Sequence, residues 1–144
     1  MIRENIIACK ESVTDAIIVL KENKSIYRGQ NNGNEEILKY KVDGCIYNNT
    51  SNVSRCDYLL ETTSQLFFIE LKGTHIKKGL GQLYTTIGNI KNNFREKTIK
   101  ARLVSTRGAK PNRLNTYKEY KDLSKLIGVK NIKIKNTPFE ENLN

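Results

Sequence analysis

Two carboxylates and a lysine stand close together in residues 55–73, R-C-D-Y-L-L-E-T-T-S-Q-L-F-F-I-E-L-K-G. Asp57 lies in one short apolar segment, and Glu70 and Lys72 end the next one. Charged groups at the border of an apolar sheet cost free energy unless they are paired or bind a ligand. A divalent cation and a phosphate would together use both acids and the lysine. A structural ion pair between Asp57 and Lys72 is the alternative interpretation.

The chain around these residues is predicted to form a three-stranded meander. Residues 65–72 indicate a buried strand, because the centre of this segment is apolar, aromatic and β-branched. Side chains alternate between the two faces of a strand, so Glu70 and Lys72 are expected on the same face. The two preceding strands are predicted over residues 36–47 and 55–60, with a polar turn between them.

Helices are predicted on both sides of the meander. Residues 2–22 carry apolar side chains at intervals of three and four, which favours one long helix, and residues 23–34 are rich in Gly and Asn and predict a loop. Residues 76–94 repeat apolar side chains at steps of four and three after a possible N-cap at Thr74. The remaining predicted elements are a strand over 100–106, a loop over 107–112, a helix over 114–127, a strand over 131–135 and a loose polar tail over 137–144.

The charge of the chain is unevenly distributed. Residues 1–71 hold 8 Lys/Arg and 10 Asp/Glu, whereas residues 72–135 hold 17 Lys/Arg and 3 Asp/Glu. A region this basic would attract a polyanion and bind phosphates with release of counterions. A solvated lysine-rich surface is the simpler alternative. Next to a candidate carboxylate site, the charge favours nucleic acid as the partner.

The three cysteines do not form a zinc motif, because no C-x-x-C occurs and the single His is remote in sequence. If the strands before and after residues 50 and 51 form a symmetric hairpin, Cys45 and Cys56 face one another. We expect them to be reduced packing thiols, because the N-terminus lacks the pattern of a signal peptide and the chain is predicted to be cytoplasmic. No apolar run approaches the ~20 residues that a membrane span needs.

The order helix, three strands, helix, strand, with Asp57 on the second strand and Glu70-Leu71-Lys72 ending the third, resembles the PD-(D/E)XK nuclease superfamily. The resemblance covers residues 2–106. It implies an α/β fold with a restriction-endonuclease-like αβββαβ core, in which helices flank a mixed central sheet, extended by a C-terminal helix and strand. One such domain would span residues 1–136.

The resemblance also implies roles for the residues of the motif. Asp57, Glu70 and the carbonyl of Leu71 would bind Mg²⁺, which Mn²⁺ could replace, and Lys72 would assist the attack of water. Cys56 stands where many members have proline, and Thr86 stands where one form of the motif has tyrosine. The residues that could line the same site are Asp43, Gln82 and Glu11, and Glu4 is a further candidate from the first helix.

The function expected from these residues is that of a metal-dependent endonuclease acting on nucleic acid, with DNA as the expected substrate. The residues expected to contact the nucleic-acid backbone are His75, Lys77, Lys78, Arg102, Arg107, Lys110 and Arg113. A homodimer would suit the cutting of two strands. The alternative is a non-catalytic nucleic-acid-binding or interaction module of the same fold, in which Asp57, Glu70 and Lys72 form a structural ion network.

Overall fold

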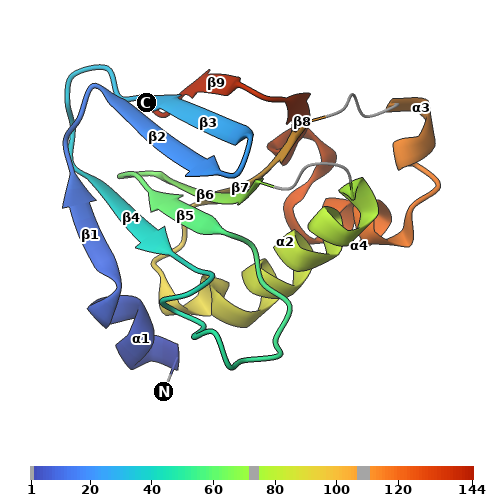
Figure 1. Ribbon diagram of the computed structural model, residues 1–144, viewed down its shortest axis with the longest axis horizontal. Coiled ribbons are helices and arrows are strands. Elements are labelled where there is room, and N and C mark those ends of the chain that lie inside the picture. Colours follow the sequence, from blue (N-terminus) through green and yellow to red (C-terminus); the bar gives the residue numbers. More distant parts are fainter. Residues whose placement is uncertain (1, 72–74, 107–110) are drawn as a thin grey trace.

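The computed structural model describes residues 2–71, 75–106 and 111–144 and contains two β-sheets (Figure 1). A six-stranded mixed sheet has the order β1-β4-β5-β6-β7-β8, and a three-stranded sheet has the order β2-β3-β9. The strands of the larger sheet are β1 (Lys10–Val13), β4 (Ile37–Lys41), β5 (Tyr58–Glu61), β6 (Gln65–Leu71), β7 (Thr98–Ser105) and β8 (Ile132–Asn136). The strands of the smaller sheet are β2 (Ile17–Glu22), β3 (Ser25–Gln30) and β9 (Phe139–Asn142).

The predicted meander is confirmed. β4, β5 and β6 pair antiparallel in sequence order, and β7 then pairs parallel with β6. The connection between these parallel strands contains α2 (Ile76–Ile90) and the short 3₁₀ helix η1 (Lys91–Asn93). The predicted C-terminal additions are also present, because α4 (Lys118–Ile127) leads through the 3₁₀ helix η2 (Val129–Asn131) to β8, which lies parallel to β7.

The predicted helix over residues 2–22 is wrong. Only α1 (Ile2–Ala8) is helical, and the rest of that segment forms β1 and β2. The expected loop over residues 23–34 instead contains β3, which pairs antiparallel with β2. Asn23 has a positive φ of 54° at the tight turn between these two strands, a conformation that asparagine tolerates better than most residues. Residues 17–30 therefore form a β-hairpin where a long helix and a loop were predicted.

The C-terminal tail over residues 137–144 is not loose. β9 lies next to β3 (Figure 1) and is parallel to it, with Tyr27 opposite Phe139. The side chains of Phe139 and Leu143 are fully buried. Leu143 also packs against Gly29, where a Cβ atom would lie 2.7 Å from a Leu143 methyl group. The tail therefore completes the smaller sheet.

The two faces of the six-stranded sheet are covered by different layers. Leu59, Phe68 and Leu103 project toward the helices, where they pack with apolar residues of α2 and α4. Leu60 and Phe67 project to the opposite face, where they pack against the three-stranded sheet. Helices were expected to flank the central sheet, and one of its faces is instead covered by a second sheet. None of the helices in the described part of the chain is long and apolar enough to cross a bilayer.

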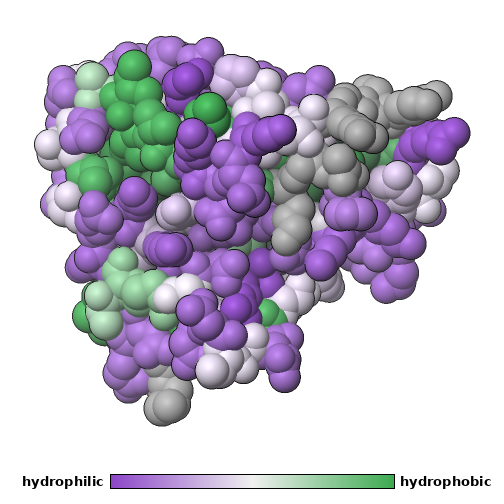
Figure 2. Space-filling model, viewed as in Figure 1, coloured by the Kyte–Doolittle hydropathy of each residue, from purple (hydrophilic) through white to green (hydrophobic). Residues whose placement is uncertain are grey.

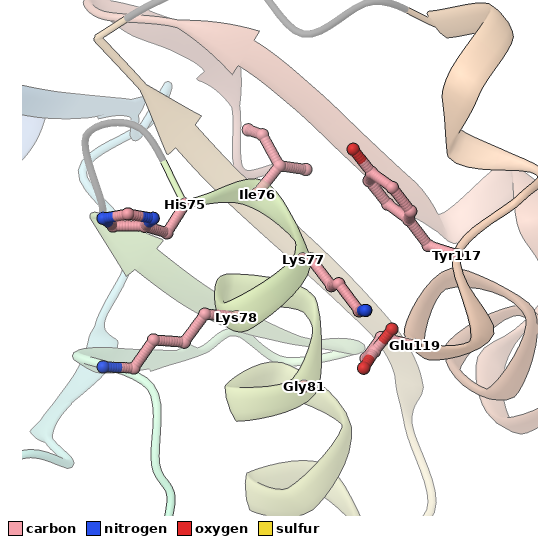
Figure 3. Close-up of a pocket in the computed structure, with 7 residues that line it drawn as sticks. All are labelled: His75, Ile76, Lys77, Lys78, Gly81, Tyr117 and Glu119. Carbon is pink, nitrogen blue, oxygen red and sulfur yellow. The ribbon is translucent and has the colours of Figure 1, made fainter.

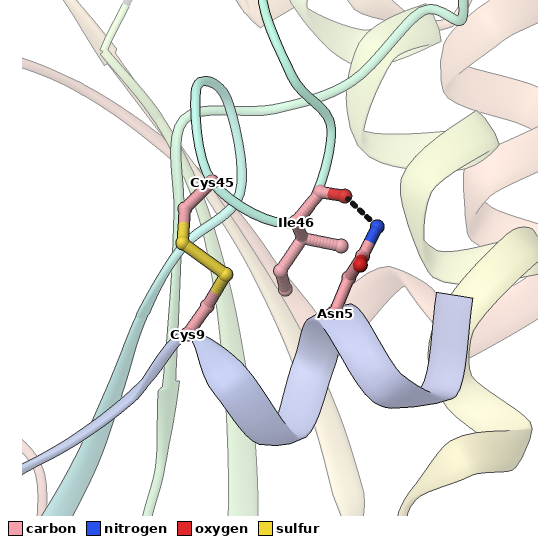
Figure 4. Close-up of a disulfide and its surroundings, with 4 residues drawn as sticks. All are labelled: Asn5, Cys9, Cys45 and Ile46. Atoms are coloured by element: carbon pink, nitrogen blue, oxygen red, sulfur yellow. Dashed lines mark hydrogen bonds between the residues drawn. A yellow bond between two sulfur atoms is a disulfide. The ribbon is translucent and has the colours of Figure 1, made fainter. Parts of the chain in front are cut away.

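A disulfide joins Cys9, just after α1, to Cys45 in the turn that follows β4 (Figure 4). The Asn5 side chain donates a hydrogen bond to the Ile46 carbonyl beside it. The predicted contact between Cys45 and Cys56 is therefore wrong. Tyr40 pairs with Leu59, a register that the symmetric hairpin does not allow, and Cys56 is a buried free thiol.

Candidate functional site

Asp57 and Glu70 lie near one another where β5 and β6 meet α2, and both act on the pKa of Cys56. The antiparallel register pairs Tyr58 with Ile69, and the Asp57 amide donates to the Ile69 carbonyl, so Asp57 and Glu70 are each one residue from this pair. Alternation along β6 puts Glu70 on the same face as Phe68, which is the face covered by the helices. The first two members of the predicted motif are therefore brought together as expected.

The orientation of Asp57 is fixed by the backbone of the neighbouring strand. Its Oδ2 atom accepts a hydrogen bond of 2.7 Å from the amide N–H of Leu71, the last residue of β6. The Asp57 carbonyl also accepts hydrogen bonds from the amides of Val42 and Asp43. Asp57 is partly exposed, so its carboxylate lies between the interior and solvent. The Leu71 side chain points to the opposite face and is buried there.

Glu70 is fully buried, with 0% of its surface exposed. Gly79 of α2 packs near it, because a Cβ atom at this position would lie 3.4 Å from Glu70 Cγ and 2.5 Å from a Leu103 methyl group. A side chain at position 79 would therefore push α2 away from the sheet. Gly79 allows the close approach that encloses Glu70.

The wall beside the carboxylates is formed by Cys56, Gln82 and Thr86. Thr86 accepts a hydrogen bond of 2.8 Å from the amide of Cys56, and the Gln82 side chain donates one to the carbonyl of Arg55. Burial, followed by the negative charges of Glu70 and Asp57, raises the pKa of the Cys56 thiol. These surroundings favour the neutral thiol of Cys56. Gln82 Oε1 is buried without a hydrogen-bond partner in the described part of the chain.

The other acids proposed for the site are paired with a cation or exposed on other elements. Asp43 forms an ion pair of 3.0 Å with Arg55, which also donates to the carbonyls of Ser51, Val53 and Asn48, so Asp43 stabilises the loop before Cys56. Glu11 is exposed on the edge strand β1, opposite Lys39. Glu4 is exposed on α1. Among residues 2–71, 75–106 and 111–144, no group of three or more His, Cys, Asp or Glu side chains is placed to hold a metal.

The basic residues predicted to contact nucleic acid lie in different parts of the structure. His75, Lys77 and Lys78 are exposed at the start of α2, and Arg113 is exposed in the short helix α3 (Pro111–Leu114). His75 is the N-cap residue of α2. Lys72, Arg107 and Lys110, together with the predicted N-cap Thr74, lie outside the described residues.

Arg102 does not lie on the surface. Its side chain is 1% exposed and projects from β7 toward the three-stranded sheet, where its Nε donates to both carboxylate oxygens of Glu141 at 3.0 and 2.9 Å. Its Nη1 donates to the carbonyls of Ala101 and Asn131, and its guanidinium lies 5.6 Å from the centre of the Phe67 ring. Arg102 is thus a structural core residue, and the expectation that it contacts nucleic acid is wrong.

A pocket of about 540 Å³ opens between the start of α2 and the start of α4 (Figure 3). The residues that line it are His75, Ile76, Lys77, Lys78, Gly81, Tyr117 and Glu119. The Lys77 and Glu119 side chains point toward one another, whereas His75 and Lys78 extend away from Tyr117. Tyr117 and Glu119 were not predicted as site residues, because α4 reaches the start of α2 only in the folded chain.

The surface around these elements is mostly hydrophilic (Figure 2). The apolar patch seen over β2 includes Ile17 and Val19, which are 50% and 51% exposed on this edge strand of the smaller sheet. The patch is formed by the outward-facing residues of a strand whose alternate residues, Ile18 and Leu20, are buried. It lies on a different sheet from the carboxylate pair.

Comparison of the chain with protein-family models, curated proteins and solved structures finds no match.

Proposed function

We propose that the protein is a metal-dependent nuclease that hydrolyses phosphodiester bonds in nucleic acid, with DNA as the expected substrate. The observation that carries the proposal is the proximity of Asp57 and Glu70, one partly exposed and one fully buried, beneath a helix with cationic side chains at its start. Two carboxylates held close together suit a divalent cation, and the neighbouring cations suit a phosphate.

The arrangement of the strands supports the same proposal. The antiparallel strands β4, β5 and β6, the helix α2 and the parallel strand β7 follow the order that the PD-(D/E)XK resemblance implies. In that arrangement the acids belong to β5 and β6, the second and third strands of the meander. We therefore propose a restriction-endonuclease-like core, to which the three-stranded sheet, α4 and β8 are additions.

The donor set at the carboxylate pair fits a hard divalent cation. Asp57 and Glu70 would hold Mg²⁺ or Mn²⁺ through oxygen atoms, with the Leu71 carbonyl as the third ligand from the protein, and waters would fill the other positions. When bound, such an ion polarises a phosphoryl oxygen and lowers the pKa of a bound water. The Leu71 amide holds Asp57 in one orientation, so this ligand is fixed before the ion binds.

The chain would supply the remaining functions through its basic residues. Lys72 is proposed to position the attacking water and to stabilise the charge that develops on the phosphate. His75, Lys77 and Lys78, at the start of α2, would hold the phosphates next to the scissile one. The neutral thiol of Cys56 would only shield the carboxylates from solvent.

We infer a cytoplasmic location, and the Cys9–Cys45 disulfide is the feature that opposes this inference. Disulfides persist in oxidising compartments and are rare in reducing ones. Rapid alkylation of the protein in its cells, followed by mass spectrometry, measures the oxidised fraction of Cys9 and Cys45. A largely alkylated pair would support the cytoplasm, and a protected pair would exclude a reducing compartment.

The test of the proposed function is cleavage of a panel of plasmid, single-stranded DNA, branched DNA and RNA, with Mg²⁺ or Mn²⁺ and with EDTA. We expect metal-dependent cleavage that disappears in Lys72→Ala while binding is retained. Lys24→Ala, which removes an exposed lysine from the β2–β3 turn, is the matched control and should cleave like the wild type. If the wild type binds the panel tightly but cuts none of it with any metal, the protein is the non-catalytic binding module.

A further inference from the structure

The pocket between α2 and α4 has two chemically different ends. One end carries the exposed side chains of His75 and Lys78, which extend together away from Tyr117 (Figure 3). At the other end the Tyr117 ring extends from the start of α4 toward Ile76, and Glu119 lies below it. The pocket thus has His75 and Lys78 at one end, and at the other an aromatic and apolar surface next to Lys77 and Glu119, which face one another.

The cationic end is suited to a phosphate for two independent reasons. Lys78 carries a positive charge, and α2 is a helix of 15 residues whose first turn lines the pocket and leaves backbone N–H groups for an anion. α4 also begins at this pocket, with Tyr117 as its N-cap residue. At the far end the Glu119 carboxylate faces the Lys77 ammonium, so the positive charge that has no facing carboxylate among the lining residues is that of Lys78.

The far end is suited to a flat, polar ring. Tyr117 and Ile76 provide aromatic and apolar surface. Glu119 Oε1 is a buried acceptor without a hydrogen-bond partner in the part of the chain that the structure describes. Nucleobases combine a π-face with N–H donors at the edge, and the π-face and the Watson–Crick edge are exposed only when the base is unpaired and unstacked.

The volume of the pocket depends on a glycine. Gly81 faces α4, and a Cβ atom at this position would meet only Glu119 Cγ, at 3.6 Å. A larger side chain there would extend into the pocket without a backbone clash. With Gly81 the pocket measures about 540 Å³, which lies within the range of about 300–1,000 Å³ typical of small-molecule sites.

We propose that this pocket holds one unpaired nucleotide of the substrate, with the base against Tyr117 and the phosphate at His75 and Lys78. The substrate class would then be single-stranded nucleic acid, or duplexes with a single-stranded segment, and not a fully paired duplex. The inference rests on the proposed nuclease function. It places the nucleotide beside the scissile position, because His75 lies one helical turn before Gly79, and Gly79 packs against Glu70.

The experiment is binding of a short fluorescent single-stranded oligonucleotide, and of the blunt duplex of the same sequence, measured by anisotropy in EDTA. We expect the single strand to bind at least about tenfold more tightly than the duplex, which is the scale of one base–aromatic stack. Gly81→Leu should remove that preference. Gly88→Leu is the matched control, because it adds the same side chain to α2 where a Cβ atom has nothing within 4 Å, and it should bind like the wild type.

A second pair of variants tests the stacking surface. Tyr117→Ala should weaken binding of the single strand about tenfold and leave the duplex unchanged, whereas Tyr117→Phe should retain most of the affinity. Equal binding of both nucleic acids by the wild type, or equal effects of Gly81→Leu and Gly88→Leu, would overturn the nucleotide pocket. Because EDTA prevents cleavage, this result is independent of the nuclease test, in which failure is the absence of cutting by a protein that still binds.

Discussion

Two buried charges, Arg102 and Glu70, lie on opposite faces of the same sheet, and their surroundings differ. Arg102 on β7 is 1% exposed and is matched by the carboxylate of Glu141, by two backbone carbonyls and by the Phe67 ring. Glu70 on β6 is 0% exposed and lies near a second acid, Asp57, and the thiol of Cys56. Arg102 is thus held by an acid and by backbone carbonyls, whereas Glu70 has a second acid among its neighbours.

This difference separates a structural site from a candidate functional one. A buried ion pair with additional hydrogen bonds offsets the free energy of desolvation within the fold. Two neighbouring carboxylates repel one another, and a bound cation reverses that repulsion. We therefore expect the face that carries Arg102 to respond to substitutions through stability, and the face that carries Glu70 to respond through metal and catalysis.

The largest expected effect is the loss of cleavage activity in the Glu70→Gln and Asp57→Asn variants. Each variant keeps the size of the side chain and removes a charged metal ligand. The transition state then loses several kcal/mol of stabilisation by the metal, which corresponds to a decrease in the cleavage rate of about 10³-fold. The measurement is the single-turnover rate on the substrate found in the panel. Glu140→Gln removes an exposed carboxylate from β9 and should keep the wild-type rate. A comparable loss in this control would contradict a specific role for the pair.

The second largest effect is expected on stability, at the face of the sheet that carries Arg102. Glu141→Ala leaves the Arg102 guanidinium buried without its carboxylate, so we expect the free energy of unfolding to decrease by about 3–5 kcal/mol. Urea denaturation measures this change. Glu140→Ala, at the neighbouring exposed position, should change it by less than about 0.5 kcal/mol. A small effect of Glu141→Ala would mean that the two buried charges do not differ as described.

The third effect concerns the cross-link on the helix-covered side. Cys9 and Cys45 close a loop with a sequence separation of 36, and α1 packs there through the buried Ile6. Reduction should lower the stability by about 2–4 kcal/mol. Cys9→Ser should match the reduced wild type and should not respond to reductant. A response of Cys9→Ser to reductant would show that another thiol contributes.

The smallest effect is expected at alkaline pH. Burial and then the charge of Glu141 raise the pKa of Tyr27, whose hydroxyl donates a 2.6 Å hydrogen bond to that carboxylate. The folded state therefore retains this proton at pH values where the unfolded state loses it, so stability is constant below a pH of about 10 and falls above it. Tyr27→Phe should make the decrease shallower. Tyr84→Phe, at an exposed tyrosine, should leave the pH profile unchanged.

The meander, α2 and β7 were predictable because each has a strong local pattern. The run from Leu66 to Leu71 is continuously apolar except for Glu70, and α2 repeats apolar residues on one face. The apolar pattern of residues 2–22 is ambiguous, because Ile17 to Leu20 suit one face of a helix as well as a strand. Their strand conformation depends on the turn at Asn23 and on pairing with β3.

The proximity of Asp57 and Glu70 was also predictable, because it follows from two adjacent strands and a short turn. The structural role of Arg102 was not predictable from the sequence. Its partner Glu141 lies in a segment predicted to be a loose tail, which forms a strand only by pairing with β3. The Cys9–Cys45 bond was missed for a similar reason, because it requires α1 to pack against the turn after β4. Contacts between distant segments carry little signal in one sequence.

Metal binding by the carboxylate pair tests the central claim most directly. Isothermal titration with Mn²⁺ should give one site in the wild type, which Glu70→Gln and Asp57→Asn abolish and Glu140→Gln retains. The same ion should raise the unfolding temperature of the wild type and of Glu140→Gln only. Equal Mn²⁺ binding by all four proteins, or none in the wild type, would contradict the account and leave Asp57 and Glu70 as structural residues.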